Sequence, residues 1–581
     1  MFKKNTKHSQ GSLFSFINTL PSRQQKLLQQ SEEYKFYEII FCSINEEDFS
    51  VLFSETDSRP NAPVNALVSA LILMNRYSWS YEELFKNINF NLLTKTALGL
   101  KSLDEIPFCS ATIFNFQNRL NKYQTETGIN LLEKAFDYLT KGQLDTLKIK
   151  TNIQRTDSTF AASNIRNYSR LQLLIEVLIR LYRSINEADK QYFYKELKPY
   201  VGGTSENYVY AIKPSDIPLQ IEKLGTLYYR LHQQLKGRYC EDKAFEIFER
   251  VYKEHFKTEE EKVVVKLPEE ISSSSIQSPD DIDAAYRNKN GKSSKGQTIN
   301  ITETANPDNT LNLLTDVSVQ KNNIDDSKVL ETRIEKIKEK TPDIEELHFD
   351  GAYGSKNNDV KFEELEIQPV QTAIRGREAR VAITIEELED NQYKVGCPNQ
   401  AVLSVPGRKK HKAIFSLKIC SKCPLAALCP TKQNNDSRVY YFDRTEYLKR
   451  KRLTSINKIP VQRQKLRNNI EATVSEFKRK MHSGKLKVRG YFKTTVFAFS
   501  MAISINFGRI FRHISDYYRR AAQSFCIERQ YVSNLCVFGA ERLLFLENLL
   551  STLFFTWLWN HKYDIAKQPT IFCSLTNKWA F

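Results

Sequence analysis

The chain has no long apolar run, and this absence argues against a membrane protein. Its longest apolar stretch, LLSTLFFTWLW at 549–559, falls short of the ~20 residues that span a bilayer. The opening residues, MFKKNTKHSQGSLFSF, contain no apolar core long enough for a signal peptide. No internal repeat is visible either. We therefore expect a cytoplasmic protein without a membrane partner.

Cysteine is sparse, at 10 in 581 residues, and thiols stay reduced in the cytoplasm. Four of them follow the spacing C-x₂₂-C-x₂-C-x₅-C, which fits a closed, structural zinc site, with His411 as a substitute ligand. Scattered, reduced thiols are the alternative. The four predicted ligands are Cys397, Cys420, Cys423 and Cys429. The others show no ligand spacing and are predicted to be free: Cys42, Cys109, Cys240, Cys526, Cys536 and Cys573.

Acidic residues are scarce in one segment of the chain. The net charge is +17 overall, with 41% hydrophobic and 26% charged residues. Residues 401–520 contain 28 Lys and Arg but only 6 Asp and Glu, a net charge of +22, so the remaining residues carry −5. A basic surface this concentrated suits a polyanion, and DNA or RNA suits it better than anionic lipid.

Helical patterns fill residues 61–140. We expect helices near 63–77, 80–88 and 110–120, with Pro63 in the first turn of the first, a Ser80–Glu83 capping box in the second and Ser110 capping the third. A compact module of this kind suits helix-turn-helix DNA binding, although an ordinary helical core has the same pattern.

Strand patterns follow this module. Alternating apolar and polar residues from Leu147 to Arg155 predict a strand that ends at Asp157. A second strand, which starts at 343, is predicted to end at Asp350. Further strands at 297–305 and 310–320 are joined by the turn NPDN, a helix covers 326–340, and a last strand covers 366–374. Between the strand that ends at Asp157 and the strand at 297–305 lie a helical stretch at 168–256 and a linker or mobile loop at 269–296. This order predicts an α/β fold with a ribonuclease-H-like mixed sheet.

Two strand-ending aspartates and one helix predict a metal site. If their strands are neighbours, Asp157 and Asp350 point into one crevice. On a predicted helix over 465–479, Leu466, Ile470, Val474, Phe477 and Met481 share the apolar face, and Arg467, Glu471 and Lys478 lie along its border. A surface salt-bridge ladder is one reading of that border. The other is that Glu471 joins the two aspartates around Mg²⁺ or Mn²⁺, which relieves the repulsion between three carboxylates.

Three short motifs resemble those of DDE transposases from bacterial insertion sequences: TDST (156–159), DGAYGS (350–355) and RNNIEATVSEFK (467–478). The third motif of that group is Tyr-x₂-Arg-x₃-Glu-x₆-Lys. Arg467, Glu471 and Lys478 fit it, whereas Gln464 stands at the Tyr position. The N-terminal helical module and the segments 278–286 and 319–327 are also similar, and related transposases carry a similar Cys-rich insertion.

The resemblance implies a transposase that cuts DNA at insertion-sequence ends and joins them to target DNA. It implies that Asp157, Asp350 and Glu471 bind Mg²⁺ or Mn²⁺. It also implies that the DNA is contacted by Arg467, Lys478 and Gln464, the last of which replaces the Tyr of the family motif. Lys485, Lys487 and Arg489 would line a DNA backbone path, or form a solvated charged face. The partners implied are terminal inverted repeats and target DNA, with a homodimer in the synaptic complex.

Two other functions fit the same residues. A catalytically silent DNA-binding regulator derived from a transposase would bind without cutting, although the presence of all three carboxylates argues against it. A nuclease with the same kind of sheet would act on RNA or hybrid strands.

The expected domain boundaries follow from these patterns. They are an N-terminal segment (1–60), a helical DNA-binding-type domain (61–140), a catalytic core (145–160, 295–375 and 460–515), a helical insertion with linker (161–294), a Cys-rich insertion (376–459) and a C-terminal helical region (516–581). Apolar residues in 521–581 predict core or dimer contacts.

Overall fold

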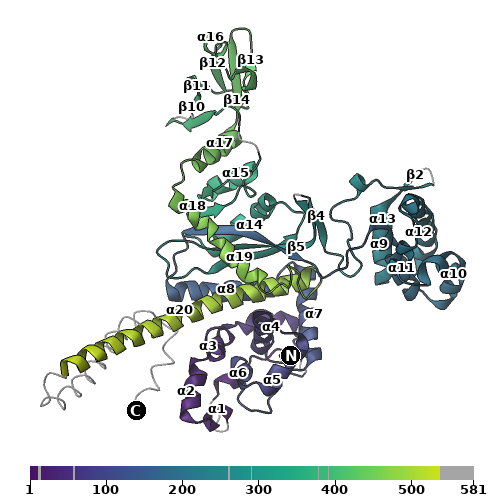
Figure 1. Ribbon diagram of the computed structural model, residues 1–581, viewed down its shortest axis with the longest axis vertical. Helices are drawn as coiled ribbons and strands as arrows, with labels where there is room; N and C mark the ends of the chain where they lie inside the picture. Colours follow the sequence, from purple (N-terminus) through teal and green to yellow (C-terminus); the bar gives the residue numbers. More distant parts are fainter. Residues whose placement is uncertain are drawn as a thin grey trace.

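A mixed sheet with helices on both faces forms the centre of the protein (Figure 1). The computed structural model describes residues 1–10, 15–56, 59–259, 262–289, 291–376, 379–389 and 392–536, with only the backbone at 521–522 and 524–536. A helical lobe lies to one side of the sheet, and a second, smaller sheet lies at one end of the molecule (Figure 1). The predicted α/β class with a mixed sheet is confirmed.

The central sheet has the order β4-β5-β1-β7-β8, and β6 also pairs with β5. β1 is antiparallel to β5 and parallel to β7, and β7 is parallel to β8. The strands are β1 (Ile153–Ala162), β4 (Ala285–Lys289), β5 (Lys292–Thr304), β6 (Leu314–Lys321), β7 (Glu346–Phe349) and β8 (Gln368–Gln371). The predicted hairpin of 297–305 and 310–320 is confirmed as β5 and β6.

Both predicted ends of the first strand are wrong. Residues up to Leu147 belong to helix α8, which ends at a left-handed Lys148, and β1 begins only at Ile153. The strand then runs past Asp157 to Ala162, because β5 pairs with it as far as Gly296. Asp157 therefore lies in the middle of a strand, whereas Asp350 directly follows β7 as predicted.

The two faces of the sheet pack against different helices. On one face, Ile299, Ile301 and Val317 join a core shared with α8 (Leu131–Leu147), α19 (Ile470–Lys478) and α20 (Tyr491–Cys536). On the other face, Leu347 and Phe349 pack against α14 (Asp326–Lys340) and α15 (Lys356–Glu364). The predicted helix at 326–340 is confirmed.

N-terminal helices pack beneath α20 and share its core (Figure 1). The Ser80–Glu83 capping box forms as predicted. The third predicted helix begins at Ser110, but Cys109 occupies the cap position and makes no side-chain capping bond, so the assignment of Ser110 as the cap is wrong. The helices are α1 (Phe16–Thr19), α2 (Ser22–Gln30), α3 (Glu32–Ile39), α4 (Val64–Tyr77), α5 (Tyr81–Phe90), α6 (Leu92–Ala97) and α7 (Ser110–Thr127).

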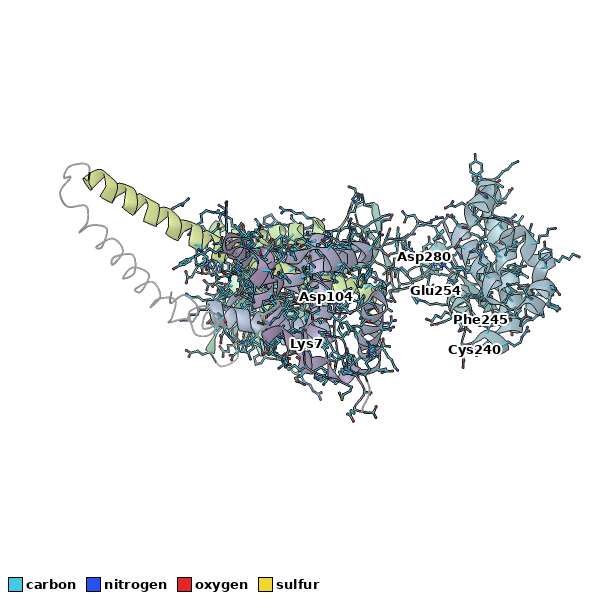
Figure 2. The ribbon with its side chains drawn as sticks, turned by 90° about the horizontal axis from the view of Figure 1, so that it is seen from below. Lys7, Asp104, Cys240, Phe245, Glu254 and Asp280 are labelled. Atoms are coloured by element: carbon cyan, nitrogen blue, oxygen red, sulfur yellow. The ribbon has the colours of Figure 1, made fainter. Side chains whose placement is uncertain are left out.

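The chain between β1 and β4 forms the helical lobe, which has its own hydrophobic core. Figure 2 shows Cys240 and Phe245 within this lobe, with Glu254 and Asp280 nearer the rest of the protein. Its elements are α9 (Arg170–Ser184), α10 (Glu187–Val201), α11 (Ser205–Tyr210), α12 (Ile217–Tyr239), α13 (Lys243–His255), β2 (Phe256–Glu259) and β3 (Lys262–Val265).

The segment 269–296 is not simply a linker or mobile loop. It contains β4 and the start of β5, and Ser278 and Asp281 are buried. Asp281 accepts a hydrogen bond from the backbone N–H of Gly490, 3.0 Å away, and Asp280 forms an ion pair with Arg180 at 2.9 Å. These polar contacts fix the segment between the lobe and the core, so its Ser/Asp-rich composition reflects hydrogen bonding.

The Cys-rich insertion folds as a second sheet, in the order β13-β14-β12-β11-β10-β9. A helix, α17, connects it to the core. The elements are β9 (Thr384–Glu387), β10 (Tyr393–Cys397), β11 (Gln400–Val405), β12 (His411–Ser416), α16 (Leu417–Cys420), β13 (Lys432–Gln433), β14 (Ser437–Phe442) and α17 (Arg444–Ile456).

The predicted helix over 465–479 is broken into two. α18 covers Val461–Asn468 and α19 begins at Ile470, so the break falls at adjacent asparagines, which favour helices weakly. Ile470, Val474, Phe477 and Met481 are buried as predicted, but Leu466 is only half-buried. The break frees the carbonyl of Leu466, which accepts a hydrogen bond of 2.7 Å from Arg155.

A long apolar helix, α20, packs against α4, α8 and β6. The expectation that every apolar stretch is too short to span a bilayer is wrong, because the segment Tyr491–Arg520 of α20 has the length and composition to cross a membrane. However, 89% of the apolar window is buried inside the protein. We therefore assign it as a core helix. The predicted C-terminal contacts of 521–581 fall on side chains outside the described residues.

A buried carboxylate fastens these helices to the sheet. Glu303 of β5 is fully buried, and it pairs with Arg155 of β1 at 2.6 Å and with Arg509 of α20 at 2.7 Å. Thr473 of α19 donates a third bond to it, at 2.7 Å. Burial alone would raise the pKa of Glu303, but Arg509 and Arg155 lower it overall. This stabilisation is complete above the ordinary pKa of Glu and is lost as the pH falls through the lowered pKa.

We predict that Glu303→Gln destabilises the protein by about 3–5 kcal/mol, because the buried Arg155 loses its counter-charge and Arg509 keeps only that of Glu476. Urea denaturation of the full chain measures this change. The control is Glu339→Gln, on the exposed side of α14, which should leave the midpoint unchanged. Equal midpoints for the two variants would contradict the prediction.

Candidate active site

The pairing of β1 with β7 brings the two aspartates together. Arg155 lies opposite His348 in this parallel pair, and continuing the register by two residues places Asp157 opposite Asp350. Side chains alternate along a strand, so Asp157 faces the same side as Arg155. That side is covered by α18 and α19, both of which contact β1.

Arg467 lies between the three predicted metal ligands. Its Nη2 donates to Asp157 Oδ2 at 2.7 Å and lies 4.0 Å from Asp350 Oδ2. Its Nη1 lies 3.5 Å from Glu471 Oε1 across the α18–α19 break. One guanidinium therefore contacts three carboxylates that are up to 314 positions apart in the chain. The interpretation as a surface salt-bridge ladder accounts for the contact of Arg467 with Glu471 but not for its contacts with Asp157 and Asp350.

The three carboxylates differ in their exposure to solvent. The side chain of Asp157 is 12% exposed, that of Asp350 is 35% exposed and that of Glu471 is 61% exposed. The pKa of Asp157 is raised to about 6 overall: burial raises it most, Arg467 lowers it, and the charges of Asp350 and Glu471 raise it. The site therefore has a buried floor and an open side, and its negative charge is in excess of what Arg467 compensates.

The donor set of this site fits a hard divalent cation. Carboxylate oxygens are the protein ligands that Mg²⁺ and Mn²⁺ prefer, and such an ion would relieve both the burial of Asp157 and the smaller repulsion from Asp350 and Glu471. As placed, no three His, Cys, Asp or Glu side chains among the described residues form a ready metal-binding group. With Arg467 between the three carboxylates, closer approach around an ion requires that its guanidinium move.

A fourth carboxylate, Asp326, lies behind Asp157. Ser158 Oγ, on the opposite face of β1 from Asp157, donates to Asp326 Oδ1 at 2.9 Å. Burial raises the pKa of Asp326, and the charge of Asp350 also raises it. Sequence reasoning missed Asp326; its position at the first residue of α14 and inside the segment NNIDDS was the available signal.

Two glycines of DGAYGS permit close packing beside Asp350. A Cβ at Gly351 would meet the Ala373 carbonyl oxygen at 2.8 Å, and one at Gly354 would collide with side-chain atoms of Arg452 and Gln371. Between them, Tyr353 is fully buried and donates to Asn300 of β5 at 2.6 Å. The motif therefore packs the loop after β7 tightly against β8, α17 and β5.

The predicted DNA-contacting residues lie on α18, on α19 and beyond. Gln464 of α18 donates to the Ile459 carbonyl at 3.2 Å, and Lys478 is exposed at the end of α19. The three basic residues beyond α19 alternate with Leu486 and Val488, which are buried and half-buried. Lys487 donates to the Ser78 carbonyl at 2.7 Å, and Arg489 donates to the Asn164 carbonyl at 2.7 Å. These three exposed residues are Lys485, Lys487 and Arg489.

The four predicted zinc ligands line one small cavity at the end of the second sheet. Burial raises the pKa of Cys420, as do the other three thiols, whereas Arg438 lowers it. Gln400 donates to Cys420 Sγ at 3.2 Å, and Thr431 donates to Cys429 Sγ at 3.2 Å. Four cysteines at one cavity are the donor type that a structural zinc ion takes, but as placed their thiols do not form a ready metal-binding group.

His411 is not part of this cluster. It lies at the opposite end of β12 from Cys420 and packs against the rings of Tyr393, at 4.8 Å, and Phe442, at 5.4 Å. The alternative of His411 as a substitute ligand is therefore wrong. The cysteines Cys42, Cys109 and Cys240 are free thiols, as predicted, whereas the side chains of Cys526, Cys536 and Cys573 lie outside the described residues.

Two family models match the chain. A transposase DDE domain matches residues 397–511, and the transposase domain DUF772 matches residues 24–119. No curated protein and no solved structure matches. The first match contains Glu471, Arg467 and the cysteine cluster, and neither match reaches Asp157 or Asp350. Together the two matches support a DDE transposase.

We predict that Arg467→Gln lowers the melting temperature of the metal-free protein, because three carboxylates lose the cation between them. Adding MgCl₂ should then raise the melting temperature of this variant more than that of the unaltered protein. Differential scanning fluorimetry with and without MgCl₂ measures both effects. Arg479→Gln, at an exposed arginine after α19, is the matched control. The same response to MgCl₂ in all three proteins would refute the prediction.

Proposed function

We propose that this protein is a DNA transposase that cuts at the ends of an insertion sequence and joins those ends to target DNA. The observation that carries the proposal is the contact of Arg467 with Asp157, Asp350 and Glu471. The two transposase family matches support the same class independently.

The three carboxylates would hold Mg²⁺ or Mn²⁺. When bound, a pair of such ions activates a nucleophilic oxygen and stabilises the leaving oxygen of a phosphodiester. Asp157 would anchor the ions from the buried floor of the site, since its backbone is fixed within the sheet. Glu471, the most exposed of the three, would close the site from the side open to DNA.

Arg467 has two roles in this proposal. Without DNA, it neutralises the three carboxylates. With DNA, its planar guanidinium would bind a phosphate near the cleaved bond, and Lys478 and Gln464 would contact the same backbone. The exposed Lys485, Lys487 and Arg489 would extend this path along the DNA. Positioning and charge stabilisation would supply most of the catalysis.

The strand order supports a ribonuclease-H-like core. A three-stranded antiparallel unit, β6-β5-β1, continues through β1 into the parallel strands β7 and β8. We propose that residues 145–160, 295–375 and 460–515 form this core. The helices within 61–140 would then act as the DNA-binding domain, 161–294 as a helical insertion and 376–459 as a Cys-rich zinc insertion.

Terminal inverted repeats and target DNA are the proposed partners. Two ends must be held together before joining, so we propose a homodimer in the synaptic complex. The cytoplasm is the proposed location, because the one helix of the described residues that is apolar enough to span a membrane is buried in the core.

Our prediction for catalysis is that Asp350→Asn and Glu471→Gln each reduce cleavage in Mg²⁺ by at least ~100-fold. The substrate is a duplex that carries the DNA bordering the reading frame, and cleavage is followed on a denaturing gel. Asp343→Asn, at an exposed position before β7, is the matched control and should cleave normally. Cleavage by either site variant at the unaltered rate would overturn the proposal, and DNA binding without cleavage by the unaltered protein would favour a regulator.

For the cysteine cluster, we predict about one zinc per chain by elemental analysis. Zinc should be lost when Cys420 and Cys423 are both replaced by Ser, because a closed site needs all four thiolates. Cys240→Ser, in the helical lobe, should retain the metal. If the unaltered protein contains no zinc, the zinc insertion is disproved.

A further inference from the structure

The hairpin between β11 and β12 carries the densest positive charge of the second sheet. Its turn has the sequence PGRKKHK, with Arg408, Lys409, Lys410 and Lys412 all exposed. Residues 401–442, which contain this hairpin, have eight Lys and Arg but one Asp and no Glu. Within the described part of the chain, these four side chains make no ion pair or hydrogen bond with the protein.

The turn that presents these charges is restrained. Val405 pairs with Lys412 at the end of the two strands, so the loop between them is short. Pro406 fixes one backbone angle, and a Cβ at Gly407 would lie 2.5 Å from the Lys410 carbonyl oxygen, so the backbone closes tightly there. Four like charges held on a short turn repel one another, and a phosphate backbone relieves that repulsion.

The second sheet is in turn fixed to the catalytic core. Arg444 of α17 forms ion pairs with Glu363 of α15 and Glu387 of β9. Arg452 of the same helix pairs with the buried Asp359 at 2.5 Å. Figure 1 shows the hairpin sheet beyond α17, at the far end from the N-terminal helices. The hairpin therefore reaches a part of space that the residues around Glu471 do not.

We infer that the β11–β12 hairpin is a second DNA-contacting site, which binds the phosphate backbone of duplex DNA through Arg408, Lys409, Lys410 and Lys412. This inference rests on the proposed function, because it takes the polyanion to be DNA. The contact is sequence-independent and lies outside the catalytic site, so it adds affinity and fixes the direction of the duplex without taking part in chemistry.

The sheet beside the turn fits this assignment. Leu403, Val405, Ile414 and Tyr441 are 40–58% exposed and lie on neighbouring strands. Tyr441 lies directly opposite Lys412. Apolar and aromatic side chains next to cations can pack on the sugar and base edges of DNA once the phosphates are held. A second copy of this chain would instead have to bring acidic residues to the turn.

The test replaces Arg408, Lys409, Lys410 and Lys412 together by Gln in the full chain. Binding to a random-sequence duplex of about 40 base pairs is measured by fluorescence anisotropy between about 50 and 300 mM KCl. We expect Kd to rise ~10–100-fold near 100 mM KCl, and the slope of log Kd against log salt to fall by about 3 to 4, since each phosphate contact contributes ~0.9. The melting temperature should not fall, because all four side chains are exposed and their mutual repulsion is removed.

The matched control replaces four exposed lysines of the helical lobe by Gln and so removes the same charge: Lys195, Lys213, Lys223 and Lys236. This control should keep the slope of the unaltered protein.

If both variants lose the same slope, or if neither does, the hairpin site is refuted while the transposase proposal stands. If the hairpin variant keeps its DNA affinity but changes its oligomeric state in light scattering, the face contacts another copy and the inference is also refuted. If the unaltered protein binds no duplex at all, the proposed function itself fails.

Discussion

The arrangement of the candidate site depends on the buried pairing of Glu303 with Arg155 and Arg509. This carboxylate lies on the same face of the sheet as Asp157, because Glu303 pairs with Arg155, two residues before Asp157 in β1. It joins β1 to α20 directly and to α19 through Thr473. Arg155 also binds the Leu466 carbonyl, which is exposed only because α18 and α19 are separate helices. One buried charge is thus linked to α19 through Thr473 and to the end of α18 through Arg155.

The break in turn decides where the charges of the site meet. Arg467 belongs to the last turn of α18 and Glu471 to the first turn of α19. A negative residue is stabilised at a helix N-terminus and a positive one at a C-terminus, so both helix dipoles favour this arrangement. Burial is the main cause of the raised pKa of Asp157, and the charges of Asp350 and Glu471 add to it. A site with this excess of negative charge gains free energy from a divalent cation that completes its charge balance.

Sequence patterns predicted the sheet better than they predicted the site. The β5–β6 hairpin, α14 and the position of Asp350 followed from alternation, helical period and turn residues. The location of Asp157 within its strand did not, because pairing with β5 extends β1 through polar residues that alternation alone does not mark. The helix break at Asn468 and Asn469 was hidden by an apolar period that continues across it. Asp326 was missed since its contact with Ser158 joins residues 168 positions apart, which no local pattern reveals.

The helical lobe enters and leaves the core at a single place. Ala162 and Gly296 are paired at the end of the β1–β5 ladder, and Gly296 approaches the Ala161 carbonyl so closely that no other residue fits there. Ala285, where the chain returns from the lobe into β4, pairs with Gly296 as well, so the more than one hundred residues between β1 and β4 leave and rejoin the sheet beside one residue. Such an attachment makes the lobe a modular addition: its size and surface can diverge, or the whole unit can be exchanged, while the spacing of the strands that hold the carboxylates stays the same.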